Sequence, residues 1–291
     1  LKRLDFDFFE LLDAVTIARS RKHIETFYDT KDIGEFPERL KPISYHLPIT
    51  DRDDVLGFNE IFAQLSILNL AVYAPVTYIQ PSRKKKYEEL YDTKTEGGKG
   101  TFKQADREQS LQALMTTNLL KRLESSVEAF RLTLGSLSRN IQLTLDAIER
   151  FEHAGGDASI ADLQNDLDQL GIEDEDLSGI DEFTVGKKIQ ISLADMDIPS
   201  WKHDLSADHI IINSLITSME IVEPKDDAKL QHLIRTIQDK MKSPINPGNK
   251  KVIVFTAYAD TANYLFEHLA PHFSATEACH TGIVTGSSGP R

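Results

Sequence analysis

The 291-residue sequence contains a single cysteine, Cys279, and this scarcity excludes an internal disulfide. A chain without disulfides suits a reducing compartment, so we expect a cytoplasmic protein. Long hydrophobic runs are missing as well, because no stretch of the sequence approaches the roughly 18 continuous apolar residues that a membrane-spanning helix needs. We therefore expect no membrane partner.

Positive charge is also scarce, since 33 Lys and Arg stand against 46 Asp and Glu, which gives a formal net charge of −13. A negatively charged protein repels nucleic acid on average, and this counts against a simple DNA-binding module. The charge is unevenly spread, however. Residues 152–182 hold many acids and no Lys or Arg, whereas basic residues gather at 18–23 and within 81–107. Local charge therefore matters more than the total.

Motifs that would bind a metal or a nucleotide are missing too. The nine histidines show no metal-ligand spacing with Cys279 or with paired acids, so we expect no metal site. A phosphate-binding loop requires the order GxxxxGK[ST], and "EGGKGT" at 96–101 has these letters in another order. Asp181 and Glu182 do not follow an apolar strand, so we do not expect them to bind Mg²⁺.

What the sequence does contain is helical periodicity, with apolar residues recurring every three or four positions. The longest periodic run ends in Gly155 and Gly156, which favour a helix end because glycine readily adopts the left-handed conformation. The pattern predicts helices over 4–28, 55–76, 110–156, 206–222 and 226–243.

Charged segments between and on these helices are expected at the surface. Lys121, Arg122 and Arg131 lie on the longest predicted helix, where we expect them to face solvent. The basic run 83–86 is expected in an exposed loop. Residues from about 152 to 199 are acidic with little apolar continuity, which predicts a peripheral insertion.

Strand signals are few and far apart. Alternation of apolar residues with other types predicts a strand over 43–50. Residues 252–255 are all apolar, as in a parallel strand that is buried on both faces. A polar turn, a helix over 261–269 and a second candidate strand within "CHTGIVTGSSG" (279–289) follow. By pattern alone, this order suits any small α/β domain.

The same C-terminal order resembles the start of the second RecA-like lobe of superfamily-two helicases, especially the Swi/Snf-type translocating ATPases. "DDAKLQHLIRTIQDK" and "NKKVIVFTAYADTANYLFEHL" are similar to the helix and the motif IV segment that open that lobe. Two further stretches, "LLDAVTIARSRKHI" and "FPERLKPISYHLPIT", resemble the end of the first lobe. A fourth, "LLKRLESSVEAFRLTL", is similar to a helix between the lobes in bacterial helicases of this kind.

The resemblance implies a mainly α fold with a small α/β part. Residues 1–50 would end the first RecA-like lobe, 51–227 would form a helical interlobe region, and 228–291 would begin the second lobe. The chain would then be an internal part of an ATP-dependent DNA helicase or translocase. We expect a fragment, because the sequence starts without Met and stops soon after the first strand of a lobe.

The resemblance also implies which partners and cofactors to expect. The intact parent would hydrolyse ATP with Mg²⁺ and would act on DNA together with its remaining helicase lobes. This chain would supply the interlobe scaffold and the first strand of the second lobe. Since it has no phosphate-binding loop, we expect it to bind neither ATP nor Mg²⁺ alone and to be no enzyme by itself.

Candidate contact residues follow from the resemblance and from position, and none of them is catalytic. One group is basic and lies near the end of the first lobe, while two groups follow the predicted strands, where α/β sheets place ligand contacts. Each group also has a structural interpretation, as a solvated helix face or as a helix cap. The candidates for nucleic-acid or cleft contact are Arg19, Arg21, Lys22, Thr256, Tyr258, Asp260, Thr285, Gly286 and Ser287.

A different class of function stays open beside the helicase hypothesis. The chain would then be a self-contained, mainly helical protein-interaction module without nucleotide chemistry. That hypothesis predicts a closed core in which residues 252–255 are covered. The helicase hypothesis instead predicts an unfinished sheet with an open edge. A third hypothesis, a small α/β enzyme centred on 228–291, is disfavoured because so short a segment hardly forms a doubly wound sheet with a pocket.

Overall fold

The computed structural model divides the chain into two compact units, Leu1–His46 and Leu47–Arg291. The residues that the structure describes are 21, 24, 40–94, 101–154, 191–245, 248–277 and 279–286.

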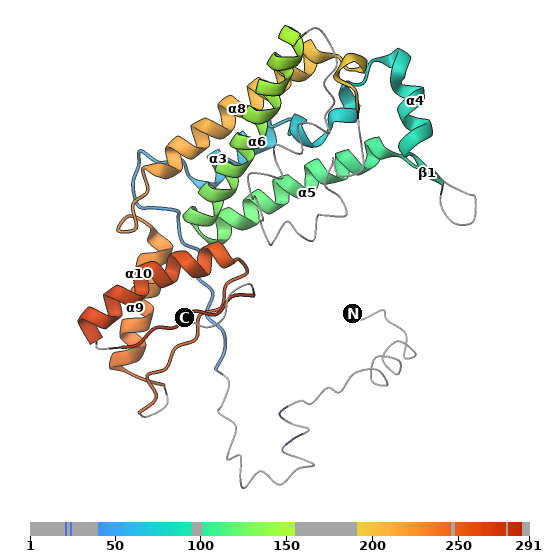
Figure 1. Ribbon diagram of the computed structural model, residues 1–291. Helices are drawn as coiled ribbons and strands as arrows, with labels where there is room; N and C mark the ends of the chain where they lie inside the picture. Colours follow the sequence, from blue (N-terminus) through green and yellow to red (C-terminus); the bar gives the residue numbers. More distant parts are fainter. Residues whose placement is uncertain are drawn as a thin grey trace. The chain divides into compact units, whose positions relative to one another are not determined.

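The described part of the second unit is mainly helical, which confirms the mainly α part of the predicted fold (Figure 1). A short antiparallel hairpin, β1 (Thr93–Lys94) with β2 (Thr101–Phe102), is its one named sheet. The helices are α3 (Phe58–Ser66), η1 (Ala71–Tyr73), η2 (Pro75–Tyr78), α4 (Pro81–Tyr91), α5 (Gln104–Ser125), α6 (Val127–Ala154), η4 (Leu193–Asp195), α8 (Ile198–Glu220), α9 (Ala228–Lys242) and α10 (Ala259–Glu277). None of the described helices is long and apolar enough to cross a membrane.

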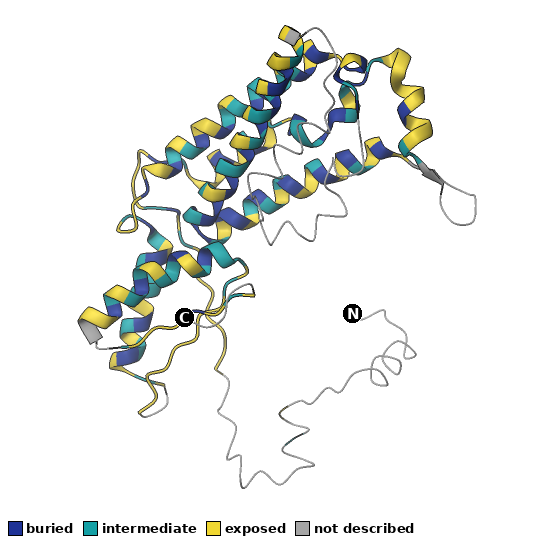
Figure 2. Cartoon of the chain, in the orientation of Figure 1, coloured by how far each residue is buried: buried dark blue, intermediate teal, exposed yellow. Residues whose placement is uncertain are grey.

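The three longest helices, α5, α6 and α8, form a bundle around one hydrophobic cluster. Along α6 the buried residues Phe130, Leu134, Leu137, Ile141 and Ile148 recur at helical spacing, so one stripe of the helix faces the core. Figure 2 shows the same division, with buried stripes on the bundle helices and exposed residues between them. Burying a large apolar side chain contributes about 1.5–3 kcal/mol, so this cluster is the main source of stability.

The predicted helix over 55–76 is wrong beyond Ser66, where α3 ends. Leu70 adopts a left-handed conformation with φ 49, and Pro75 begins the short helix η2. A left-handed residue and a proline both interrupt an α-helix, so the chain instead forms two short 3-10 turns. The predicted helix over 110–156 is likewise interrupted, at Ser126.

A buried carboxylate from α8 holds the connector between α3 and α4. Asp208 accepts hydrogen bonds from the backbone N–H groups of Asn69 at 2.7 Å and Ala71 at 2.9 Å. Trp201, also from α8, donates its indole N–H to the carbonyl of Ala71 at 3.0 Å. Burial raises the pKa of Asp208, although the backbone donors oppose the shift. The connector therefore depends on side chains that are far away in the sequence.

Glu108 of α5 likewise holds the backbone of η2 with a buried carboxyl group. Its Oε2 accepts a hydrogen bond from the N–H of Val76 at 3.0 Å, and the residue is only 1% exposed. Burial disfavours the charged carboxylate and raises the pKa of Glu108 to about 8. A carboxyl group that is protonated near neutral pH thus lies inside the bundle.

The basic run 83–86 lies in helix α4 rather than in the predicted loop. Three side chains of α4 converge on Asp195: the distances to its carboxylate are 2.8 Å from Lys86 Nζ, 2.8 Å from the Tyr87 hydroxyl and 3.2 Å from Arg83 Nε. The hydrogen bond from Lys86, then that from Tyr87, lowers the pKa of Asp195. Arg83 and Lys86 therefore have a structural role in attaching α4.

The far end of the predicted acidic insertion belongs to the core. Residues 155–190 lie outside the described part of the chain, but Ile191, Leu193, Met196 and Ile198 are buried in the bundle cluster. Met196 also forms a bridge with Ile79. This stretch is therefore interior rather than peripheral.

The predicted strands are not formed in the described part of the chain. Residues 43–50, residues 252–255 and the described part of the second candidate strand, 279–286, belong to no helix or strand. Ile253 is 77% and Phe255 90% exposed. The backbone N–H and C=O groups of a strand form their hydrogen bonds with a neighbouring strand. No described segment pairs in this way with the three predicted strands. The described residues therefore do not show the RecA-like strands of the expected fold.

The C-terminal helices agree better with the sequence. The helix predicted over 206–222 is α8, which begins earlier, at Ile198. The helix predicted over 226–243 is α9, and Asp227 caps it by accepting from the N–H of Leu230 at 2.9 Å. The helix predicted over 261–269 is α10, which continues through Pro271. The helix predicted over 4–28 lies outside the described residues except for Arg21 and Ile24, which are helical.

Candidate functional site at the α5–α6 corner

The sharp corner between α5 and α6 is made by Ser126. Its extended backbone ends α5, and its N–H donates to the carbonyl of Arg122 at 3.0 Å. Its hydroxyl then accepts from the N–H of Ala129 at 3.0 Å, which caps the start of α6. One serine therefore both stops a helix and starts the next, and the corner presents the last turn of α5.

Arg122 lies in that last turn, and its side chain is completely buried, with 0% exposure. Its Nη1 lies 2.7 Å from Oδ2 of Asp260, at the start of α10. The guanidinium carbon lies 4.5 Å from the ring centroid of Tyr258, which is a cation–π distance. Burying a charge is costly unless it is paired, so Asp260 and Tyr258 together make this arginine tolerable.

Hydroxyl groups extend the contact between the corner and α10. The Oγ1 of Thr261 lies 2.7 Å from Oγ of Ser125 and 2.9 Å from Oγ of Ser126. The Tyr258 hydroxyl donates to Oδ1 of Asn118 at 3.3 Å. We refer to these seven residues together as the Arg122 junction: Asn118, Arg122, Ser125, Ser126, Tyr258, Asp260 and Thr261.

Beside the junction, Asp227 connects α9 with α10. One carboxylate oxygen caps α9, and the other accepts from the Tyr264 hydroxyl at 2.9 Å. Burial first, and the charge of Asp227 second, raise the pKa of Tyr264 well above its usual range. Tyr264 therefore stays protonated and acts as a donor.

The structure brings together only some of the predicted site residues. Tyr258 and Asp260 meet at the junction, and the Thr256 hydroxyl donates to the carbonyl of Tyr258 at 2.9 Å, within the turn before α10. Thr285 is half-buried and Gly286 exposed, in the segment 279–286. Arg21 is helical and exposed and belongs to the first unit, while the other predicted candidates lie outside the described residues: Arg19, Lys22 and Ser287.

Arg122 itself is the residue that sequence reasoning missed. It was expected to face solvent with Lys121 and Arg131, and for Arg122 this is wrong. A signal was available, because Met115, Leu119 and Arg122 lie three or four positions apart and so occupy the buried stripe of α5. A charged residue at a core position predicts a buried partner.

An apolar groove opens next to the junction. It has a volume of about 910 Å³ and runs between α9, α10 and the two predicted strand segments. Apolar side chains dominate its lining, among them Ile237, Leu269 and Phe273 from the helices. Ile253 and Phe255 line it as well and are largely exposed to solvent.

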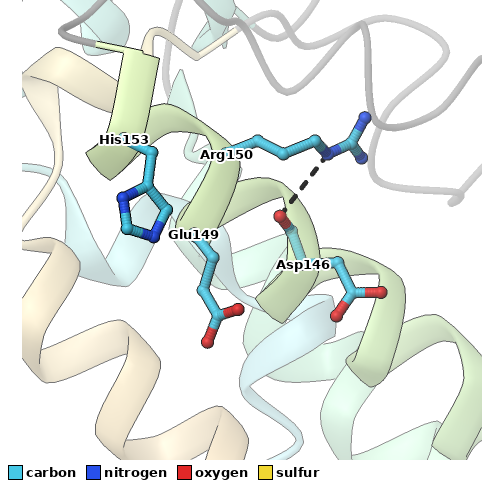
Figure 3. Close-up of a pocket in the computed structure, with 4 residues that line it drawn as sticks. All are labelled: Asp146, Glu149, Arg150 and His153. Atoms are coloured by element: carbon cyan, nitrogen blue, oxygen red, sulfur yellow. Dashed lines mark hydrogen bonds between the residues drawn. The ribbon is translucent and has the colours of Figure 1, made fainter.

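A second hollow, of about 810 Å³, lies along the C-terminal part of α6. Figure 3 shows its four described lining residues, Asp146, Glu149, Arg150 and His153, all on this one helix. Arg150 Nε donates to the carbonyl of Asp146 at 3.4 Å. Among the residues that the structure describes, no group of three or more His, Cys, Asp or Glu could hold a metal ion. The described residues of this hollow therefore present exposed charges and no metal-binding cluster.

Comparison with protein-family models, with curated proteins and with solved structures finds no match to this chain. The likeness to helicases thus depends on the quoted sequence segments.

Proposed function

We propose that this chain is an internal part of an ATP-dependent DNA helicase or translocase of the Swi/Snf type. The α5–α6–α8 bundle would be the interlobe region, and α9, residues 252–255 and α10 would open the second RecA-like lobe. The chain would supply scaffold to a motor whose nucleotide site is built elsewhere.

The observation that carries the proposal is the exposure of residues 252–255. A run of four apolar residues is suited to burial on both faces of a parallel sheet. Here it lies between two helices and lines an open groove, with Phe255 90% exposed. Such a surface is costly in a finished protein and is expected where neighbouring strands of a lobe would pack. The interaction-module hypothesis predicts this segment to be covered.

ATP and Mg²⁺ would belong to the intact motor rather than to this chain. The sequence has no GxxxxGK[ST] loop, and the described residues offer no acidic cluster that fits a metal ion. The residues present therefore do not fit the nucleotide, and we assign no step of ATP hydrolysis to them.

The test is DNA-stimulated ATP hydrolysis by the full-length natural protein that contains this chain, with the 291-residue chain as the control. We expect turnover by the full-length protein only. The proposal fails if the natural coding sequence has no phosphate-binding loop before Leu1 and no arginine-bearing motif after Arg291. It also fails if the full-length protein hydrolyses no ATP in the presence of DNA.

A further inference from the structure

The second unit contains two separate hydrophobic clusters, and no described residue belongs to both. The larger cluster fills the bundle. The smaller one joins α9 to α10 and is centred on Leu230, Leu269 and Phe273. Since each body buries its own apolar side chains, each has a core that does not depend on the other.

Among the described residues, the contacts between these two bodies include the hydrogen bonds and the ion pair of the Arg122 junction. Near the junction, Lys229 Nζ donates to the carbonyl of Glu124, and the N–H of Ala228 donates to the carbonyl of Ile49 at 3.2 Å. When such polar contacts open, water replaces the lost partners, so opening costs much less than exposing an apolar core. Relative motion is the usual behaviour of bodies that meet through a contact of this kind.

A short exposed turn connects the two bodies. Val222 belongs to the bundle cluster, and Asp227 is bonded within the other body, to Leu230 and Tyr264. The residues between them, 223–226, are exposed or only half-buried. This turn can therefore change its backbone angles without disturbing either core.

We propose that the α9–α10 body undocks reversibly from the bundle about residues 223–226, and that the Arg122–Asp260 ion pair is the latch. The Asp260 side chain is 35% exposed, so water reaches the carboxylate, whereas the Arg122 side chain is fully buried in the docked arrangement. Undocking moves the start of α10 and the end of the segment 252–255 together. The inference does not rest on the proposed function, because it concerns this chain without DNA or nucleotide.

The latch is tested by measuring a distance between the two bodies in the full 291-residue chain. Spin labels at Ser214→Cys on α8 and Glu267→Cys on α10, in a Cys279→Ser background, report that distance by pulsed electron resonance. We expect one main distance, and we expect Asp260→Asn to raise the long-distance population at least tenfold. Glu152→Gln removes an exposed ion pair with Lys202 inside the bundle and should leave the distribution unchanged.

A locked variant gives the closed reference. Ser125→Cys with Thr261→Cys, oxidised before labelling, replaces two hydroxyls that lie 2.7 Å apart and should remove the long-distance population even with Asp260→Asn. The proposal is overturned if Asp260→Asn alone gives the same distribution as the locked protein. It is also overturned if amide exchange shows that Asp260→Asn unfolds the bundle and α9–α10 together in one step, since the clusters would then be one cooperative body.

Discussion

In the bundle, the apolar residues that recur at helical spacing turn inward, whereas in the α9–α10 body an entire apolar run, 252–255, stays largely outside. The difference follows from how a helical and an extended backbone each form their hydrogen bonds. A helix makes its hydrogen bonds within itself and needs only a partner for its apolar stripe. An extended segment needs neighbouring strands for its backbone as well as for its side chains. The described bundle helices therefore cover their own apolar stripes, whereas the described part of the α9–α10 body leaves residues 252–255 exposed.

Truncating one core aromatic in each body should have the largest effect and should distinguish the two bodies by the part of the chain that unfolds. Phe130→Ala in the bundle removes a fully buried ring and should cost about 3–5 kcal/mol of global stability. Phe273→Ala in the smaller cluster should melt α9 and α10 locally and leave the bundle folded. Denaturant unfolding followed by amide exchange distinguishes these results. A single cooperative loss of both bodies in Phe273→Ala contradicts the comparison.

Removing the carboxylate of Asp208 should have the next largest effect. Asp208→Ala leaves the N–H groups of Asn69 and Ala71 without their acceptor, and an unsatisfied buried donor costs about 1–3 kcal/mol. We expect a loss of about 2–4 kcal/mol in chemical denaturation. Asp204→Ala, which removes the partner of the Tyr78 hydroxyl and leaves the acceptor Asp208 in place, is the matched control and should cost less. Equal losses would contradict the assigned role of Asp208.

Glu108 should make the bundle less stable as the pH rises. Its ordinary pKa is 4.5 and its pKa in the folded chain is about 8, so the folded state holds a proton that the unfolded state has released. The stability from this proton is fully present below about pH 4.5 and is lost as the pH approaches 8. Glu108→Gln should therefore be about 1–3 kcal/mol more stable than the unmodified chain at pH 8 and similar at pH 5.

Unfolding curves at several pH values, with the exposed Glu89→Gln as the control, measure this effect. The same pH dependence in Glu108→Gln and in the unmodified chain would show that Glu108 does not hold the proton.

The smallest effect on stability is expected at Phe255. Because its ring is exposed, Phe255→Ser should change the free energy of unfolding by less than about 0.5 kcal/mol. It should nevertheless reduce self-association of the chain, since an open apolar segment attracts further copies. Sedimentation velocity measures this, and Phe62→Ser, an exposed aromatic of the bundle, is the matched control. A large loss of stability in Phe255→Ser would mean that the segment is packed.

How far the sequence predicted the fold depended on whether a signal was local. The apolar period of α8 and α9 is local, and both helices were predicted. The end of α3 was not, because the connector that follows it is held by Asp208 and Trp201 from a distant helix. The strand at 252–255 was predicted from its apolar content and from the helicase resemblance, and strand formation depends on pairing that apolar content does not encode.

The candidate site was predicted in part. Tyr258 and Asp260 were chosen as residues at a strand end that would face a cleft, and that role stays a prediction. Their contact with Arg122 was missed, because pairing across more than a hundred residues leaves no trace in local pattern. Only the position of Arg122 in the buried stripe of α5 pointed to it.

Amide hydrogen exchange of residues 252–255, measured in this chain and in the full-length natural protein, tests the account most directly. Unpaired backbone exchanges quickly, and backbone inside a parallel sheet exchanges slowly. The account predicts fast exchange in the chain alone and exchange at least a hundredfold slower in the full-length protein. Slow exchange in the chain alone, or equally fast exchange in both, would contradict it.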